Sequence, residues 1–470
     1  MTSIIPMLQR VMFAFLGLVV LGGCSQENSQ TKDQTKTIPF ASSYQAVKAK
    51  PFVITNATLL TGTGEQINNA SILIENGKIK ALGDSIDVDS AVTVLDAQGK
   101  WVTPGLIDVH SHLGVYPSPG IESSQDGNEM TSPVTAEVWA EHSVWTQDPQ
   151  MPLALAGGVT TFQVLPGSGN LIGGRGVTLK NVFARSVQGM KFPGAPHSLK
   201  MACGENPKRV YGSKGRAPST RMGNVAGYRT AWIKAAEYRR QWDSYNKSLD
   251  TTKPKKRPKR DLKLETLAKV LRGNILVHNH CYRAEEMIVM IDIAKEFGYK
   301  ISAFHHAIEA YKIADVLAKE GICAAVWADW WGFKHEAFDQ VRENAAMVDK
   351  ANACAIIHSD SALGIQHLNQ EAAKAMAAGN HNGLALQAKD AIRWITSNAA
   401  KAIGIADQTG SLEVGKMADM VIWSENPFSI YSKAEKVFID GDLKYDRNDP
   451  SLQPVSDFDL GILNPEGVRL

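Results

Sequence analysis

The feature that most constrains this chain is an apolar stretch that ends in two histidines, at 101–112 (WVTPGLIDVHSH). Its β-branched and aliphatic residues predict a short buried strand that ends near His110. Because side chains alternate between faces along a strand, His110 and His112 point the same way. Two imidazoles at one strand end can bind one metal ion, although such a pair also occurs in purely structural settings. Pro104 and Gly105 break the chain just before this strand and indicate a domain crossing.

The middle of the chain alternates strand and helix patterns, which is typical of βα units and a parallel sheet. At 470 residues and 44% hydrophobic, the chain is long enough for one large domain and a smaller one. Because no G-x-G-x-x-G follows the first strand, we expect a TIM (β/α)8 barrel rather than a doubly wound sheet. The expected strands are 106–110, 160–165, 177–180, 199–203, 275–280, 300–304, 322–327 and 355–358.

Short strand patterns also occupy both ends of the chain, which predicts a small composite β-sandwich built from residues 51–103 and 409–446. The barrel then covers residues 104–408, and residues 447–470 form a C-terminal tail. Within the barrel, the insertion at 206–264 has helical composition over 228–245. We expect it to form a mobile helical cover over the strand ends, although a purely structural excursion is an equal alternative.

Residues of the metal-binding type recur at the ends of several later strands. A single histidine there is more often structural than a ligand, but a barrel brings all such positions together on one face. The complete pattern therefore predicts a metal site. Its members after strand one are Lys200 and Glu205 (strand four), His278 and His280 (strand five), His305 and His306 (strand six), and His358 and Asp360 (strand eight).

With these motifs the sequence resembles the amidohydrolase superfamily, specifically its imidazolonepropionase-related and dipeptidase-like branch, over roughly residues 50 to 445. The resemblance implies a metal-dependent hydrolase with one or two divalent ions, most commonly zinc, that cleaves amide and related bonds. It rests on VTPGLIDVHSH (102–112), AGGVTT (156–161), GENPKRVYG (204–212), HCYRAEEM (280–287), HHAIEAYKIAD (305–315), HSDS (358–361) and GSLEVGKMADMVIW (410–423).

Carried over position by position, the resemblance implies a set of metal ligands from five strands. For strand five, His280 is preferred and His278 is the alternative, since both have the same parity. For strand four the family uses either a carboxylated lysine or a glutamate, so Lys200 and Glu205 both remain open, with a slight preference for Glu205. The implied ligands are His110, His112, Glu205, His280, His306 and Asp360.

The expected chemistry follows from a metal that lowers the pKa of bound water towards about 7. In this hypothesis Asp360 takes a proton from the attacking water and delivers it to the leaving amine. Asp108 is not assigned to the site. The candidate substrate-binding residues are Tyr282 and Arg283, for which outward contacts at a helix start are equally plausible, and Arg175 and Tyr116, for which a structural role is favoured.

The N-terminal residues 1–24 resemble a bacterial lipoprotein signal peptide that ends in Leu-Gly-Gly-Cys. This implies cleavage before Cys24, a lipid anchor on its thiol and a flexible tether over 25–50. The expected location is the periplasmic side of the cell envelope, with the outer membrane favoured by Ser25. An ordinary signal peptide or an uncleaved anchor is the alternative.

Charge and cysteine content limit the other partners. The net charge is only +2, and the basic run at 253–260 contains no aromatic residue, so no nucleic-acid partner is expected. The cysteines other than Cys24 could pair in an oxidising compartment, but buried free thiols are preferred. The resemblance is also compatible with a homodimer. These four cysteines are Cys203, Cys281, Cys323 and Cys354.

The sequence as a whole predicts a metal-dependent hydrolase that cleaves an amide bond, peptide or N-acyl and open or cyclic, of a small molecule. A deaminase or lactonase that uses the same site is the alternative within enzymes. A catalytically decayed solute-binding lipoprotein and a structural envelope lipoprotein are alternatives from other classes; only the last predicts neither metal nor pocket.

Overall fold

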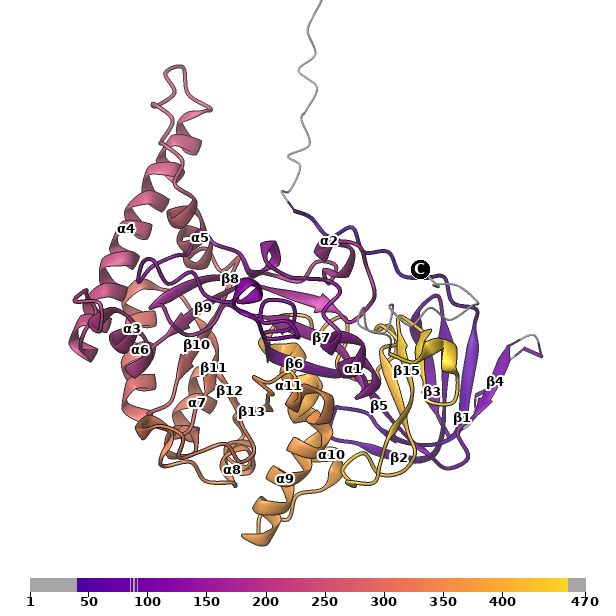
Figure 1. The fold of residues 1–470 in the computed structure, drawn as a ribbon. Coiled ribbons are helices and arrows are strands. Elements are labelled where there is room, and N and C mark those ends of the chain that lie inside the picture. The colour runs from indigo at the N-terminus through magenta and orange to yellow at the C-terminus, as the bar shows by residue number, and fades with distance from the viewer. Residues whose placement is uncertain (1–39, 85, 88, 91, 455–470) are drawn as a thin grey trace, which may run out of the picture. The chain divides into compact units, whose positions relative to one another are not determined.

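The computed structural model describes residues 40–84, 86–87, 89–90 and 92–454, whose strands form two sheets of eight (Figure 1). The signal peptide with Cys24, the tether up to residue 39 and the tail beyond residue 454 lie outside the described residues. None of the described helices has the length and apolar character needed to cross a membrane.

The first sheet combines strands from both ends of the chain, as the sequence predicted. Its two halves meet where β5 pairs antiparallel with β14, with Met420 opposite Pro104. Figure 1 shows these indigo and yellow strands beside one another. The expectation that this sheet makes a sandwich stays a prediction. The strands are β1 Phe52–Leu60, β2 Gln66–Glu75, β3 Lys78–Gly83, β4 Thr93–Asp96, β5 Trp101–Pro104, β14 Met420–Trp423, β15 Ala434–Ile439 and β16 Asp442–Asp446.

The second sheet is a nearly closed barrel whose strands follow one another in sequence order. A backbone hydrogen bond joins its two edges at their carboxyl ends: the N–H of Asp360, which follows the last strand, donates to the carbonyl of His110 in the first strand over 3.0 Å. All eight predicted strands are present with shifted ends. They are β6 Leu106–Ser111, β7 Val159–Val164, β8 Ile172–Lys180, β9 Ser198–Ala202, β10 Leu276–Cys281, β11 Ile301–His306, β12 Cys323–Val326 and β13 Cys354–Ile357.

The barrel departs from the predicted all-parallel arrangement at β8, which runs antiparallel to both β7 and β9. The segment 165–171 between β7 and β8 contains no helix. A parallel return needs a crossover of a dozen or more residues, whereas this short connection allows an antiparallel hairpin. The glycine-rich stretch 167–176 is therefore partly the hairpin connection and partly β8 itself.

The helices flank the barrel strands, and the local sequence explains where several begin and end. Helix α6 has two glutamates in its first turn and ends at Gly298, which adopts a left-handed φ of 73°. Helix α4 begins after Thr220, whose side chain accepts a hydrogen bond from the N–H of Gly223. The helices are α1 Gln150–Ala156, α2 Val187–Met190, α3 Glu205–Gly212, α4 Arg221–Ser248, α5 Leu262–Leu271, α6 Ala284–Phe297, α7 Ala314–Glu320, α8 Asn344–Lys350, α9 Leu368–His381, α10 Ala388–Ala391 and α11 Ser397–Ala402.

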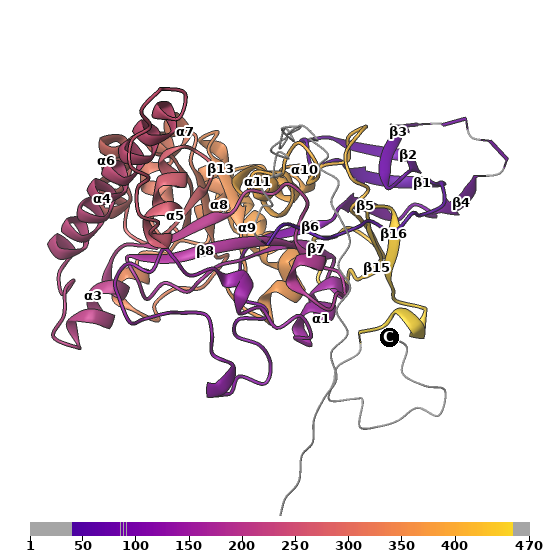
Figure 2. The same cartoon turned by 90° about the horizontal axis from the view of Figure 1, so that it is seen from above.

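The insertion at 206–264 contains nearly all of α3, all of α4 and the first residues of α5. Helices α4 and α5 pack against each other beside the barrel (Figure 2). The phenol of Tyr228 in α4 donates to the carbonyl of Ala202 at the end of β9, which ties this long helix to the barrel. Only the short helix α3 among them reaches the cavity described below. The predicted helical cover is thus limited to α3, and its mobility stays a prediction.

The four cysteines within the barrel form two disulfides, which corrects the preference for free thiols. Cys203 is bonded to Cys281, and Cys323 to Cys354. Each bond joins neighbouring strands at matched positions, for example Cys323 opposite Cys354 in the β12–β13 pairing. Sequence spacing could not show this, because the partners are 78 and 31 residues apart and only the strand register brings them together.

A buried charge network joins the barrel to the first sheet. The ammonium of Lys180, at the end of β8, lies 3.2 Å from a carboxylate oxygen of Asp419 and 3.0 Å from one of Asp440. All three side chains are almost completely buried. Removing one partner of such a network leaves an uncompensated buried charge.

We therefore expect Lys180→Met to lower the free energy of unfolding by about 3–5 kcal/mol. The matched control is Lys100→Met, because Lys100 pairs with Glu435 at 2.6 Å in a partly exposed position, where the expected change is below about 1 kcal/mol. Denaturant unfolding of both variants measures the difference. Equal changes in the two variants would contradict the assigned role of the network.

Candidate metal centre and active site

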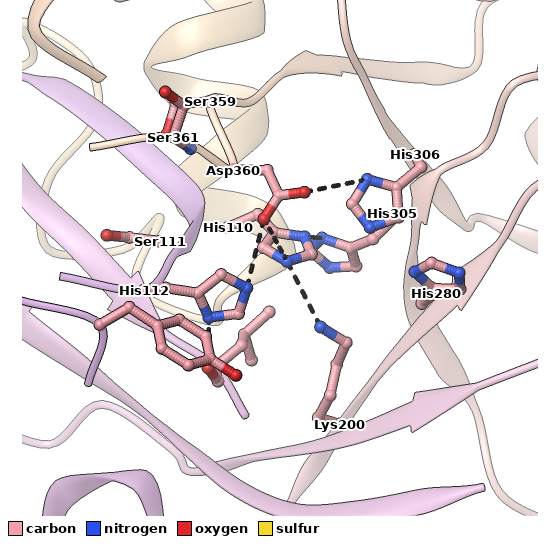
Figure 3. Close-up of polar contacts among 12 residues, drawn as sticks. His110, Ser111, His112, Lys200, His280, His305, His306, Ser359, Asp360 and Ser361 are labelled. Carbon is pink, nitrogen blue, oxygen red and sulfur yellow. Dashed lines mark hydrogen bonds and ion pairs between the residues drawn. The ribbon is translucent and has the colours of Figure 1, made fainter. Parts of the chain in front are cut away.

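Side chains from five barrel strands converge at the carboxyl ends of those strands (Figure 3). The carboxylate of Asp360 lies at the centre of the group. One of its oxygens is 3.2 Å from Nε2 of His112 and 3.5 Å from Nε2 of His110. The other is 3.9 Å from Nδ1 of His306. The structure thus brings together the predicted residues of strands one, six and eight.

The donor atoms fit a divalent metal ion. Ligand-type atoms of His110, His306 and His358 lie within 4.8 Å of one another, and those of His110, His112 and Asp360 do so as well. Among the described residues, Nδ1 of His306 and both ring nitrogens of His358 are buried without a hydrogen-bond partner. Such atoms are costly unless something coordinates them. Imidazoles with a carboxylate are a typical donor set for zinc or another first-row dication.

Burial also sets the charge state of these rings. It lowers the pKa of His110, His306 and His280 well below the usual histidine value, and neighbouring cationic groups lower it further. Burial likewise lowers the pKa of His358, to about 3. Neutral imidazoles are the form that binds metals, so no proton has to be displaced from these rings near neutral pH.

A second layer of contacts orients the first histidines. Nδ1 of His110 lies 2.9 Å from Nδ1 of His305, whose Nε2 lies 2.7 Å from Nδ1 of His278. Nδ1 of His112 lies 2.8 Å from the carbonyl oxygen of Leu165. These contacts leave Nε2 of both strand-one histidines facing Asp360. Hydrogen bonds to the far nitrogen of a ligand fix its tautomer and its ring orientation.

The structure separates the two strand-five candidates by depth. His280 lines the cavity and its ring packs against that of His306, with centroids 4.5 Å apart. His278, two residues earlier on the same face of β10, lies one layer deeper and contacts His305 and Gln163. The geometry therefore favours His280 as the residue that faces the cluster.

For strand four, the structure brings Lys200 to the cluster and not Glu205. The ammonium of Lys200, inside β9, lies 3.3 Å from Nε2 of His110 and donates to the carbonyl of Pro166 over 3.0 Å. Glu205 is the first residue of α3, and its carboxylate lies 3.6 Å from the ammonium of Lys334. The preference for Glu205 is corrected for this reason: the turn after β9 carries it past the strand end.

Unusual backbone conformations help to aim the side chains. His306, Ala307 and Asp360 have left-handed φ values of 68°, 37° and 50°. Residues with a Cβ rarely adopt this conformation, and where they do the strain is commonly found at functional sites. At the end of β11 the turn lets His305 and His306, which alternate on an ordinary strand, both contact the ring of His110.

Two further groups belong to the site: Asp108, which the sequence prediction left out, and His358, which it included without choosing it as a ligand. The buried carboxylate of Asp108 accepts hydrogen bonds from the backbone N–H groups of His110 and Ser359, and from the Ser359 hydroxyl. Burial raises the pKa of Asp108 to about 7. The available signal was parity, because residues 108, 110 and 112 share one face of β6. His358 was noted at its strand end but not chosen as a ligand.

The cluster opens into a cavity of about 830 Å³. Of the four candidate substrate-binding residues, Tyr116 and Tyr282 line it. The guanidinium of Arg175 is instead buried over the ring of Trp139 and donates to Thr266. Arg283 points away and pairs with Glu285 at the start of α6. The expectation that these two arginines line the pocket is thereby corrected.

The fold and the site together define a class: a barrel with a cluster of histidines and an aspartate at the carboxyl ends of its strands that could hold a metal ion. Residues 101–444 match the amidohydrolase family. The chain belongs to this family.

Individual relatives agree with that assignment. A crystal structure of an amidohydrolase from Thermotoga maritima is similar with a TM-score of 0.77 and 35% identity, covering 84% of this chain and all of that one. The amidohydrolase tasK of Hapsidospora irregularis is 31% identical over 84% of this chain, which spans 43% of that protein's length. A dihydroorotase of Listeria monocytogenes is 45% identical over 62 residues, 13% of this chain and 14% of that enzyme.

We expect the purified full-length chain to hold one or two equivalents of zinc or a similar metal, and His110→Ala to lose most of it, because His110 belongs to both groups of donor residues. Elemental analysis measures the content, and circular dichroism checks that the variant folds. His381→Ala is the control, since His381 is an exposed residue at the end of α9. Metal content unchanged in His110→Ala would contradict the site.

Proposed function

We propose that this protein is a metal-dependent hydrolase that cleaves an amide bond, peptide or N-acyl and open or cyclic, of a small molecule. The observation that carries the proposal is the group of buried imidazoles without hydrogen-bond partners around Asp360, at the end of a barrel of the amidohydrolase family. In a protein without a metal these positions would only cost stability.

The residues that would hold the metal are His110, His112, His306, Asp360 and, from the adjoining wall, His280. His358 is a further candidate because both of its ring nitrogens lack hydrogen-bond partners among the described residues.

We assign Lys200 the position between two metal sites, as a carboxylated lysine. Its burial lowers its pKa to about 7, so a neutral amine able to react with CO2 is accessible near neutral pH. A divalent metal bound there supplies Lewis-acid chemistry, lowering the pKa of water and polarising a carbonyl.

Asp360 is the proposed proton carrier. Burial raises its pKa, but the hydrogen bond from His112 and the surrounding positive charge outweigh this effect and leave the pKa below the usual value. The carboxylate is therefore ionised at neutral pH and able to accept a proton from the attacking water. It then delivers that proton to the nitrogen of the leaving amine, so that the amide bond breaks with a neutral leaving group. His112, whose Nε2 lies 3.2 Å away, holds one of its oxygens in position.

We also propose the branch of the family to which the chain belongs. The branch related to imidazolonepropionases and dipeptidases agrees with the sequence motifs, and the short match to dihydroorotases is compatible with a cyclic amide. A deaminase or lactonase could use the same residues, since both reactions need an activated water and a proton carrier. A decayed solute-binding protein would not need a proton carrier and would tolerate changes at Asp360.

We also propose that the protein is a periplasm-facing lipoprotein anchored through Cys24, with a composite β-sandwich beside the barrel. The two disulfides in the barrel support an oxidising compartment, because such bonds are rare in the reducing cytosol. The expected homodimer stays a prediction.

Asp360→Asn should reduce turnover by about 10²–10⁴-fold, because the amide cannot accept the proton of the attacking water. The assay follows amine release from a panel of dipeptides, N-acyl amino acids and cyclic amides. Asp339→Asn is the control, since Asp339 is exposed and pairs with Lys312 on the surface. Near-normal turnover in Asp360→Asn would remove Asp360 from this role.

The two strand-four candidates are separated by a matched pair of variants. Lys200→Met should weaken metal retention by roughly 10- to 100-fold, whereas Glu205→Gln should leave it unchanged. Dialysis against a chelator followed by elemental analysis measures retention. A loss in Glu205→Gln with retention in Lys200→Met would reverse the assignment.

A further inference from the structure

The wall of the cavity carries two kinds of group that the proposed hydrolysis does not use. The cationic side consists of two side chains, Arg209 from α3 and Lys334 from the segment after β12. The aromatic side consists of rings from that same segment, of which Trp327, Trp330 and Phe333 are the main members. The two adjoin, because the ammonium of Lys334 lies 5.8 Å from the ring centroid of Phe333, so the cavity offers charge next to apolar surface beside the metal centre.

The cationic side is incompletely neutralised. The ammonium of Lys334 lies 4.0 Å from the ring centroid of Tyr282 and 3.6 Å from a carboxylate oxygen of Glu205. Arg209 is exposed and makes no ion pair with any residue that the structure describes. An arginine on a cavity wall presents a planar fork of donors that matches a carboxylate. The acidic side chain of the wall outside the metal centre, Asp329, is already paired with Lys374 at 2.8 Å.

This cationic side is adjacent to the metal centre. The ammonium of Lys334 donates to Oδ1 of Asn206 over 2.9 Å, and Nδ2 of Asn206 lies 3.5 Å from Nε2 of His280. A single asparagine thus separates the cation from an imidazole of the site. A substrate whose carboxylate is bound by Lys334 and Arg209 could therefore place its scissile carbonyl, a few covalent bonds away in the same molecule, at the metal centre.

The aromatic side forms a continuous surface that begins at the metal centre. The ring of Trp327 stacks on His306, with centroids 4.2 Å apart. Trp330 stacks on Trp327 at 5.5 Å, and Phe333 meets Trp327 edge-on at 5.7 Å. Trp330 and Phe333 remain 39% and 57% exposed, so their faces are available to a ligand. Aromatic surface of this kind gains most from burying a flat or bulky apolar group.

We propose that the substrates of this site carry a free carboxylate on the amino-acid residue that leaves, together with a bulky apolar or aromatic side chain. Arg209 and Lys334 bind the carboxylate, and Trp327, Trp330 and Phe333 contact the side chain. The matching chemical class is a dipeptide or N-acyl amino acid with an aromatic residue at its carboxyl end. This inference rests on the proposed amide hydrolysis and adds the substrate class to it.

The test compares three substrates with the zinc-loaded full-length chain: alanyl-phenylalanine, its carboxyl-terminal amide and alanyl-glycine. We expect kcat/KM to fall by about 10- to 100-fold when the carboxylate is capped.

Arg209→Met should cause a similar loss for the free acid and little change for the amide. Trp330→Ala should reduce the preference for phenylalanine over glycine by about 10-fold. Arg229→Met is the control, because Arg229 pairs with Glu296 on the outer surface of α4.

Several outcomes would overturn the inference while leaving the hydrolase proposal intact. Equal kcat/KM for the free acid and the amide is one, and an unchanged acid preference in Arg209→Met is another. If no peptide is cleaved, calorimetry with phenylalanine and phenylalaninamide gives a separate measurement. Preference for the acid that is lost in Arg209→Met would support the inference, and absent or equal binding would overturn it. Failure to cleave any amide in the presence of bound metal would contradict the proposed function instead.

Discussion

The site depends on the junction between the first and last strands of the barrel. The carboxylate of Asp108 on β6 accepts hydrogen bonds from Ser359 beyond β13, and the N–H of Asp360 donates to the carbonyl of His110. These contacts close the barrel at the level where the imidazoles lie. They also set the position of Asp360 relative to His110 and His112, which come from the other side of the junction. A buried carboxylate with three donors is stable only if all of its partners are held in place.

A second constraint is the cost of burying many polar rings in one place. His280, His306 and His358 have ring nitrogens without hydrogen-bond partners in the described part of the chain, and each such atom carries a desolvation cost. The disulfide between Cys203 and Cys281 holds the ends of β9 and β10 together directly beside His280. The rigid scaffold keeps these rings in an arrangement that they would not adopt without external support, and a bound metal would offset the cost.

The sequence predicted most of what depends on local pattern. Strand and helix positions followed from apolar periodicity. His110, His112, His306 and Asp360 lie at or just after strand ends on the same face of a barrel, and the family resemblance singled them out among such residues. The choice between Lys200 and Glu205 was not accessible, since it depends on how sharply the chain turns after β9. The antiparallel direction of β8 was missed because the alternation of strands with helices suggested a parallel sheet throughout. The cysteine pairs depend on register between neighbouring strands, which a single sequence does not give. Arg209 lies within GENPKRVYG (204–212), but only the structure shows that this arginine lines the cavity.

The most direct measurement of the central claim is X-ray absorption at the zinc edge on the purified, zinc-loaded chain. Coordination by nitrogen and oxygen at about 2.0–2.2 Å, with the outer-shell scattering of several imidazoles, is the expected result. It should change when Asp360 or His306 is replaced. A spectrum dominated by sulfur at about 2.3 Å, or a zinc that remains hydrated and freely exchangeable, would contradict a metal centre built from these histidines and this aspartate.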